Sequence, residues 1–237
     1  MTALNDPAVV RREYADESRL ASRRAVHRLG SGPDARQVVF DAVAEIAPRR
    51  VLEVGPGEGE LAERLARELG AHVHAVDQSA RMVELTRARG IEAVVGDAQD
   101  LPFIDSTFDC VVAAWILFHV PELDRALLEV RRVLRPGGRL VAATNSERTL
   151  HELWDLVGFA PGYSFSAENG EGLLRRYFTA VERRDVRGTV IFPDRKAAQR
   201  HVAASIAAGH LADRLPRFEG PLAASRHMAV FVAESPA

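Results

Sequence analysis

The residues best placed to do chemistry lie in one glycine-rich stretch. Gly55, Gly57 and Gly59 occupy alternate positions directly after the short, mostly apolar run 51–54. Glycine lacks a Cβ atom, so it allows left-handed backbone angles and lets a ligand lie against the main chain. A helical pattern begins immediately afterwards. The stretch therefore predicts a strand, a tight loop and a helix that bind a small ligand.

Spacing and charge distinguish the possible ligands. A dinucleotide fingerprint places its third glycine five residues after the first, where this chain has Glu60, and no Gly-Lys-Ser/Thr follows as a phosphate loop requires. Glu53, Glu58 and Glu60 would repel a pyrophosphate and suit a cationic ligand. An NAD(P)-dependent oxidoreductase and a glycine turn without a ligand are the alternative interpretations.

The sequence Glu53-Val54-Gly55-Pro56-Gly57-Glu58-Gly59 resembles the first motif, E-x-G-x-G-x-G, of the class I S-adenosylmethionine-dependent methyltransferases. The resemblance implies that Glu53, Gly55, Gly57 and Gly59 bind the cofactor S-adenosyl-L-methionine. Five successive family-like signals occur between residues 51 and 144, so the cofactor assignment does not depend on one motif.

Asp77 ends the predicted strand 72–77, roughly 20 residues after the glycine loop, where a carboxylate can accept hydrogen bonds from both ribose hydroxyls of a nucleoside. It matches the second motif of the family. In the family the residues after this acid flank the adenine ring, which implies that role for Gln78 and Met82. A cap of the following helix is the alternative role for Asp77.

The segment Gly96-Asp97-Ala98-Gln99-Asp100-Leu101-Pro102-Phe103 is similar to the third motif, G-D-A-x-x-L-P-F. The resemblance implies that Asp97 reaches the exocyclic amine of adenine and that the Ala98 amide meets a ring nitrogen. An aspartate that bonds only its own turn is the alternative.

The two catalytic candidates are Trp115, the last residue of the predicted strand 108–115, and His119, which follows it. The family places donor and substrate contacts here, so Trp115 is expected to wall the methyl-transfer site and contact the cofactor, with core packing as the alternative. His119 has the chemistry of a general base near neutral pH. It could instead fix the loop by hydrogen bonding, and that structural role is the one we expect.

The elements that must position these residues alternate as strand and helix, which predicts an α/β domain with a parallel sheet. The family resemblance implies a Rossmann-like, seven-stranded sheet, mostly parallel with an antiparallel last strand, helices on both faces, and a helical insert (193–215) before that strand. Predicted strands cover 51–54, 72–77, 91–95, 108–115, 139–144, 181–188 and 228–233, and predicted helices include 34–46, 122–134, 148–157 and 168–178.

Residues 8–29 predict a helix, which resembles the N-terminal cap of small-molecule methyltransferases. Tyr14, Arg19 and Arg23 are the candidates for its inward face, Tyr14 and Arg19 as cofactor contacts, with an ordinary surface helix as the alternative. We therefore expect a single domain made of a cap (1–33), a cofactor-binding core (34–145) and a substrate side (146–237).

The composition of the chain limits the kinds of binding partner and the cellular compartment that we expect. A formal charge of −2 and a pI near 6.5 do not favour nucleic acid. Cys110 is the only cysteine, so no intramolecular disulfide can form, and no apolar run is long enough for a membrane span. A cytoplasmic monomer or homodimer without membrane contact is expected. His72 and His74 share one strand face, but no third ligand lies at metal-binding spacing, so no metal is expected.

The predicted function is methyl transfer to a small-molecule acceptor, at nitrogen or oxygen more than carbon, possibly in a biosynthetic pathway. A methyltransferase acting on RNA or protein is disfavoured by the charge and by the absence of an Asn/Asp-Pro-Pro-Tyr/Phe motif. A non-catalytic S-adenosylmethionine-binding protein is the other alternative.

Overall fold

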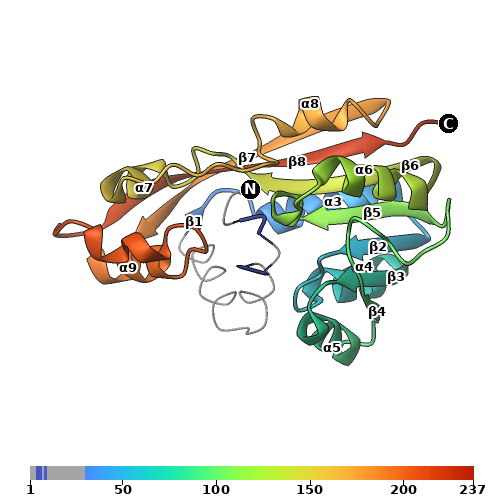
Figure 1. Cartoon of the computed structure of the whole chain (residues 1–237), viewed down its shortest axis with the longest axis horizontal. Helices are drawn as coiled ribbons and strands as arrows, with labels where there is room; N and C mark the ends of the chain where they lie inside the picture. The colour runs from blue at the N-terminus through green and yellow to red at the C-terminus, as the bar shows by residue number, and fades with distance from the viewer. Residues whose placement is uncertain (1–3, 7, 10–29) are drawn as a thin grey trace.

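An eight-stranded sheet with helices on both faces organises the chain (Figure 1). The structure, a computed structural model, describes residues 4–6, 8–9 and 30–237. The strands are β1 (Gly30–Ser31), β2 (Arg50–Val54), β3 (His72–Asp77), β4 (Glu92–Val95), β5 (Phe108–Ala114), β6 (Leu134–Asn145), β7 (Ala180–Phe192) and β8 (Leu222–Glu234). The helices are α3 (Ala35–Ile46), α4 (Glu60–Leu69), α5 (Ala80–Ala88), α6 (Leu123–Val133), α7 (His151–Val157), α8 (Gly170–Leu174) and α9 (Arg195–Ala203), with 3-10 helices η2 (Leu117–His119) and η3 (Gly209–Arg214).

The strand order is β1-β7-β8-β6-β5-β2-β3-β4. Strands β2 to β7 run in one direction, and β8 is antiparallel to both β6 and β7. This confirms the predicted Rossmann-like sheet with an antiparallel last strand. The eighth strand, β1, was not predicted, because two residues are too short to show a periodic pattern.

Chain order reverses between β2 and β5, and the carboxyl ends of β2, β3, β4 and β5 open at the same edge of the sheet. In open α/β sheets, ligands bind in the crevice beyond such a reversal. The topology therefore places the glycine loop, Asp77, Asp97 and Trp115 along one edge.

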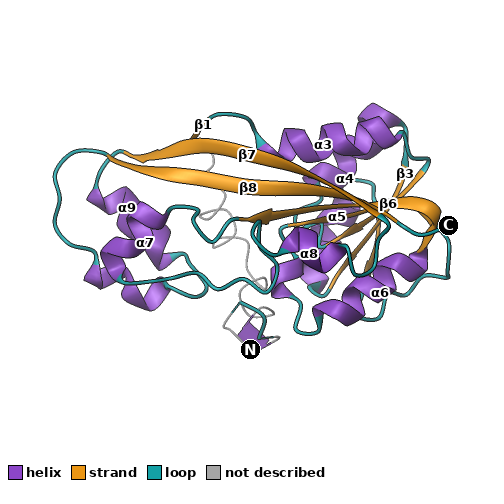
Figure 2. Cartoon of the chain, turned by 90° about the horizontal axis from the view of Figure 1, so that it is seen from above, coloured by secondary structure: helices purple, strands orange, loops and turns teal. Residues whose placement is uncertain are grey.

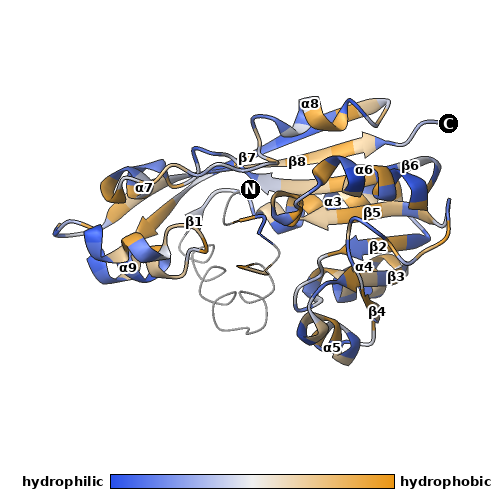
Figure 3. Ribbon diagram, in the orientation of Figure 1, coloured by the Kyte–Doolittle hydropathy of each residue, from blue (hydrophilic) through white to orange (hydrophobic). Residues whose placement is uncertain are grey.

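Two hydrophobic clusters cover the two faces of the sheet. Helices α3, α4 and α5 pack on one face, where Cys110 and Val112 of β5 point, and α6 and α8 pack on the other, where Val111 and Ala113 point (Figure 2). Hydrophobic residues run along β5 and β8, while α6 shows a polar and an apolar side (Figure 3). Burial raises the pKa of the Cys110 thiol far above its usual range, so this thiol is unreactive at neutral pH.

Specific caps and turns define the ends of these helices. The Asp34 carboxylate accepts a hydrogen bond from the Arg36 amide at 2.9 Å and caps α3, and Gly70 closes α4 with φ +66°. Two predicted helices are shorter in the structure: 148–157 is reduced to α7 and 168–178 to α8.

The strands β6, β7 and β8 differ most from the sequence prediction. β6 begins at Leu134 instead of Arg139, because the segment 135–138 forms an irregularity in the pairing with β5. β7 and β8 extend beyond their predicted ends, since residues 187–192 and 222–227 continue to pair with each other after β8 leaves β6. Figure 1 shows this hairpin reaching past the carboxyl ends of β5 and β6.

The extended hairpin carries its own core. Helices α7, α9 and η3 bury side chains against Val190, Phe192 and Ala224, apart from the two clusters that flank the main sheet. The predicted helical insert 193–215 is therefore present as α9 and η3. Among the described helices, none combines the length and hydropathy needed to cross a bilayer.

Candidate functional site

The glycine loop after β2 adopts the left-handed backbone angles that the sequence predicts. Gly55, Gly57 and Gly59 have φ values of +71°, +58° and +77°. The Gly55 amide donates to the carbonyl of Val76 at 2.8 Å, which joins the loop to the carboxyl end of β3. Non-glycine residues pay about 1–2 kcal/mol for such angles, so the three glycines are required by the backbone itself.

Side chains of α5 hold the carbonyl groups of this loop. Thr86 Oγ1 donates to the Gly57 carbonyl at 3.2 Å, and Arg89 Nε donates to the Glu58 carbonyl at 2.6 Å. Because the carbonyls are occupied from the α5 side, the loop is fixed before any ligand arrives. Sequence reasoning did not identify Thr86 or Arg89, since their partners lie almost thirty residues away.

Asp77 lies at the end of β3, facing the glycine loop. Its carboxylate accepts hydrogen bonds from the amides of Ser79, at 2.9 Å, and of Gly57. Burial nevertheless raises the pKa of Asp77 to about 6, because desolvation outweighs these two bonds. The helix cap itself is supplied by Ser79, whose hydroxyl accepts from the Met82 amide at 3.4 Å.

Trp115 follows β5 with a strained backbone. Its φ of +59° lies in the left-handed region, which is an outlier for a bulky residue. Its amide donates to the Ala143 carbonyl at 2.8 Å, and the side chain packs against both core clusters. The buried indole Nε1 has no hydrogen-bond partner among the described residues. A strained residue with an unsatisfied buried donor indicates a functional position.

His119 ends η2 and contacts the beginning of the chain. Its Nδ1 lies 2.7 Å from the carbonyl oxygen of Leu4. A carbonyl can only accept, so Nδ1 carries the proton and the ring ties η2 to the N-terminal segment. The centroid of the His119 ring lies 4.4 Å from that of the Phe118 ring, and the Phe118 centroid lies 5.2 Å from that of Tyr163. This arrangement supports the structural role expected for His119.

The third motif forms a turn with its own hydrogen bonds. Asp97 is exposed, and its carboxylate accepts from the amide of Gln99 at 2.9 Å and from its side chain at 3.0 Å. The Gln99 side-chain oxygen in turn accepts from the Glu122 amide at 2.9 Å. Ala98 is half-buried beside them. The adenine contacts of Asp97 and Ala98 stay predictions.

The other residues predicted to contact the cofactor differ in how far they are buried. Glu53 is only 3% exposed at the end of β2, and Gln78 is exposed just after β3. Met82 is completely buried, so its predicted contact with adenine is less favoured than that of Gln78. Tyr14, Arg19 and the rest of the predicted helix 10–29 lie outside the described residues.

Tyr163 and Asn145 form a polar pair near η2 that the sequence did not indicate. Asn145 is the last residue of β6, and its side chain hydrogen-bonds to the Tyr163 hydroxyl. Burial raises the pKa of Tyr163 to about 12, so its hydroxyl stays neutral. Tyr163 lies in a Gly/Pro/Ser stretch without a motif, so only its proximity in the fold reveals it.

A surface cavity of about 270 Å³ opens two residues beyond the end of β6. It is lined by Glu147, Arg148, His151, Trp154, Asp155, Phe159, Ala160 and Pro161. None of these residues belongs to the glycine loop, and Trp154 is also part of the cluster that packs against the β7/β8 hairpin.

Glu92 provides a third ligand-type side chain beside His72 and His74. It lies on β4, directly opposite His74 in the strand register. Spacing along the chain could not reveal this neighbour. The expectation of no metal was based on the lack of a third ligand at metal-binding spacing, and Glu92 is such a third side chain.

Comparisons with known proteins give a consistent family. A family model described as a methyltransferase domain matches residues 52–142. A demethylmenaquinone methyltransferase of Thermobifida fusca is 35% identical over 161 residues, which cover 65% of this chain and 67% of the relative. The corresponding enzyme of Renibacterium salmoninarum is 40% identical over 116 residues, 48% of each chain.

A ubiquinone/menaquinone biosynthesis C-methyltransferase of Hahella chejuensis is 34% identical over 155 residues, 60% of this chain and 58% of the relative. The chain spans about half the length of the first curated relatives that it matches. Among solved structures, a protein of Bacillus halodurans described as a putative methyltransferase has a TM-score of 0.66 at 20% identity, covering 85% of this chain and 100% of that one. That likeness shows the fold.

Proposed function

Because the chain belongs to the class I S-adenosylmethionine-dependent methyltransferases and takes S-adenosyl-L-methionine as its cofactor, we propose that it methylates a small-molecule acceptor. Transfer takes place at the carboxyl edge of the sheet, between the glycine loop and Trp115. The cofactor, when bound, supplies a methyl group already activated by the positive sulfonium.

The residues at this edge fit such a donor. The glycine loop presents backbone without side chains, and the Asp77 carboxylate stands where a ribose can donate to it. The buried carboxylate of Glu53 adds negative charge beneath the loop, which suits a cationic ligand. A pyrophosphate would meet repulsion from the same groups.

Trp115 is the observation that carries the assignment of the transfer site. The left-handed backbone of Trp115 costs free energy. Its buried indole N–H, which has no partner among the described residues, is a second cost. Both costs are offset when a ligand oxygen accepts from Nε1. The indole then walls the crevice, excludes water and orients the acceptor for in-line displacement.

Little acid–base chemistry is required of the chain. The hydroxyl of Tyr163 stays neutral and serves to donate or accept hydrogen bonds, and His119 holds η2 against the N-terminal segment. The proposed rate enhancement comes chiefly from alignment of the acceptor.

We propose that the methylated atom of the acceptor is nitrogen or oxygen. Carbon is the second candidate, favoured by the Hahella chejuensis relative, which is named a C-methyltransferase. A reduced quinone would present an electron-rich ring carbon, which loses its proton after it takes the methyl group, and an oxygen for Trp115 Nε1. An amine or phenol would present the heteroatom itself. RNA is disfavoured by the net charge of −2.

The test is transfer of a labelled methyl group from S-adenosylmethionine to a panel of reduced quinones, phenols and amines, with products identified by mass. We expect one acceptor class to be labelled by the wild-type protein, and to be labelled more slowly by Asp77→Asn at donor concentrations that do not saturate the variant. Tight donor binding without transfer to any member would favour the non-catalytic binding protein instead. Transfer to RNA or protein but not to the panel would contradict a small-molecule acceptor.

A further inference from the structure

A compact group of two histidines and one glutamate lies at the amino-terminal ends of β3 and β4. His72 and His74 are on β3, and Glu92 begins β4, the edge strand of the sheet. Because strands rise about 3.3 Å per residue, the Cα atoms of His72 and His74 are about 16 and about 10 Å from that of Asp77. The group is therefore separate from the proposed methyl-transfer site.

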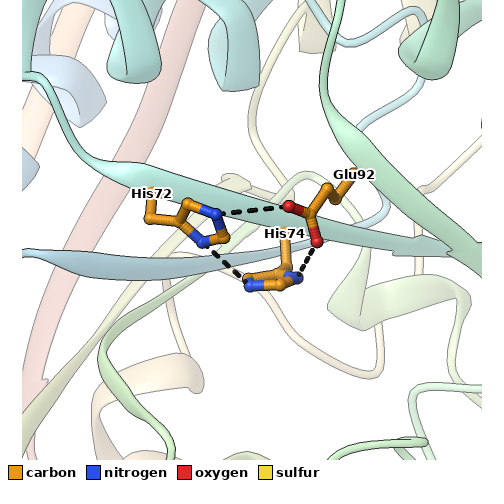
Figure 4. A group of neighbouring side chains, drawn as sticks. All are labelled: His72, His74 and Glu92. Atoms are coloured by element: carbon orange, nitrogen blue, oxygen red, sulfur yellow. Dashed lines mark hydrogen bonds and ion pairs between the residues drawn. The ribbon is translucent and has the colours of Figure 1, made fainter.

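The three side chains face one another closely (Figure 4). His72 Nδ1 lies 3.1 Å from His74 Nε2, His72 Nε2 lies 3.2 Å from one Glu92 oxygen, and His74 Nδ1 lies 3.4 Å from the other. One ligand atom from each residue can be chosen so that all three lie within 4.8 Å. Around tetrahedral zinc, ligand atoms lie about 2.0–2.1 Å from the ion and so about 3.4 Å apart.

Exposure allows the adjustment that would close the remaining gap. The side chains of His72 and Glu92 are 58% and 65% exposed, so both can rotate, whereas that of His74 is 17% exposed. The His74 ring is fixed by edge-to-face contacts with Phe103 and Phe108, at 6.0 and 5.6 Å between centroids. One ligand is thus rigid and two are mobile.

The local charge also suits a cation. The carboxylate of Glu92 lies in direct contact with both imidazole rings. Arg50, whose charge also acts on His74, is the nearby positive group that opposes a cation.

We propose that His72, His74 and Glu92 form a surface site for a divalent transition-metal ion of the zinc type, with water completing the coordination. Two imidazoles and a carboxylate suit zinc, nickel or copper, and a magnesium or calcium ion would require more oxygen ligands. A metal at this position crosslinks β3 to the edge strand β4, so it stabilises the folded protein without contacting the donor site.

Zinc chloride titrated into the full-length protein, stripped of metal by a chelator and desalted, tests the site by competition with a chromophoric zinc indicator. We expect one equivalent to bind, and His72→Ala and Glu92→Gln each to weaken binding at least about tenfold. His210→Ala, which removes an exposed histidine on η3, is the matched control and leaves the affinity unchanged.

Two further readouts separate a built site from scattered surface binding. Cobalt(II) should give visible absorption bands in the wild-type protein and in His210→Ala but not in His72→Ala, and zinc should raise the melting temperature of the same two proteins only. Binding of S-adenosylmethionine is expected to be equal in all variants. Absence of binding up to about 100 µM zinc, or equal zinc affinity in His72→Ala and the wild type, overturns the proposal.

Discussion

Gly55 and Ile116 touch so closely that no side chain fits between them: a Cβ atom on Gly55 would lie 2.3 Å from Cγ2 of Ile116. Gly55 starts the glycine loop after β2, and Ile116 follows Trp115 after β5. The loop that is proposed to hold the donor is therefore in direct contact with Ile116, the chain neighbour of the residue proposed to wall the acceptor.

Gly55→Ala should weaken S-adenosylmethionine binding at least about tenfold, because the methyl group displaces Ile116 and the loop together. Gly70→Ala is the matched control, since Gly70 has a similar φ of +66° but nothing within 4 Å of a Cβ atom. Gly70→Ala should lose about 1–2 kcal/mol of folding stability from the left-handed backbone. Gly55→Ala should lose more, because its new methyl group also meets Ile116. Calorimetry that gives the two variants equal donor affinity would refute the coupling.

Asp77→Asn should weaken donor binding by at least about 1.5 kcal/mol, the low end for a hydrogen bond to a charged group. Asp77→Ala should lose no less. Isothermal titration with the demethylated cofactor measures the change without turnover. Unchanged affinity in both variants would exclude the ribose role of this carboxylate.

The affinity of the wild-type protein for the donor should fall as the pH decreases through about 6. Ribose hydroxyls donate to the ionised carboxylate, and the pKa of Asp77 in the folded protein is raised to about 6. About a tenth of the carboxyls are ionised one pH unit below that value, so affinity at pH 5 should be about tenfold weaker than at pH 7. Asp77→Asn should not show this dependence.

The same raised pKa makes folding stability depend on pH in the direction opposite to donor affinity. The buried carboxyl contributes stability while it is protonated, fully below its unfolded pKa near 3.8, and this contribution is lost as the pH rises through about 6. Thermal melts of wild type and Asp77→Asn across pH 4 to 8 measure it. A wild type that gains stability relative to the variant over this range would contradict the burial argument.

His119→Ala should reduce the maximal rate by less than about 100-fold and also weaken donor binding, since the ring ties η2 to Leu4. His119→Gln retains a hydrogen-bond donor and should recover part of the binding. A rate loss of about 100-fold or more with normal donor affinity, rescued by added imidazole, would instead identify His119 as the general base.

Trp115→Phe keeps an aromatic wall but removes the indole N–H. Folding stability without ligands should change little, because Nε1 loses no partner among the described residues. The free energy of ligand binding in the crevice should become less favourable by about 0.5–1.5 kcal/mol, the typical net value of a neutral hydrogen bond. Steady-state kinetics with calorimetry would distinguish a loss of acceptor affinity from a loss of donor affinity, and no loss of either would contradict the proposed role.

Features that depend on local backbone chemistry could be predicted from the sequence. The left-handed angles of Gly55, Gly57 and Gly59 follow from their lack of a Cβ, and the parallel strands follow from short apolar runs between helical patterns. The site residues on these loops consequently fall along one edge of the sheet as expected.

Features that depend on register between distant segments could not be predicted. The meeting of His74 with Glu92 requires the alignment of β3 and β4, and the bond between Tyr163 and Asn145 requires the path of a loop without periodicity. β7 and β8 exceed their predicted lengths because they pair with each other beyond the main sheet, a contact between segments about forty residues apart.

The separate core of the β7/β8 hairpin has a consequence for how this protein can diverge. Leu153, Phe192 and Val202 pack among themselves and their neighbours, not against the strands that end in the glycine loop. Substitutions there can therefore accumulate without disturbing the strands that end in the glycine loop, and we propose that they reshape the acceptor side, which is expected over 146–237. Swapping this hairpin between relatives should transfer acceptor preference as a unit.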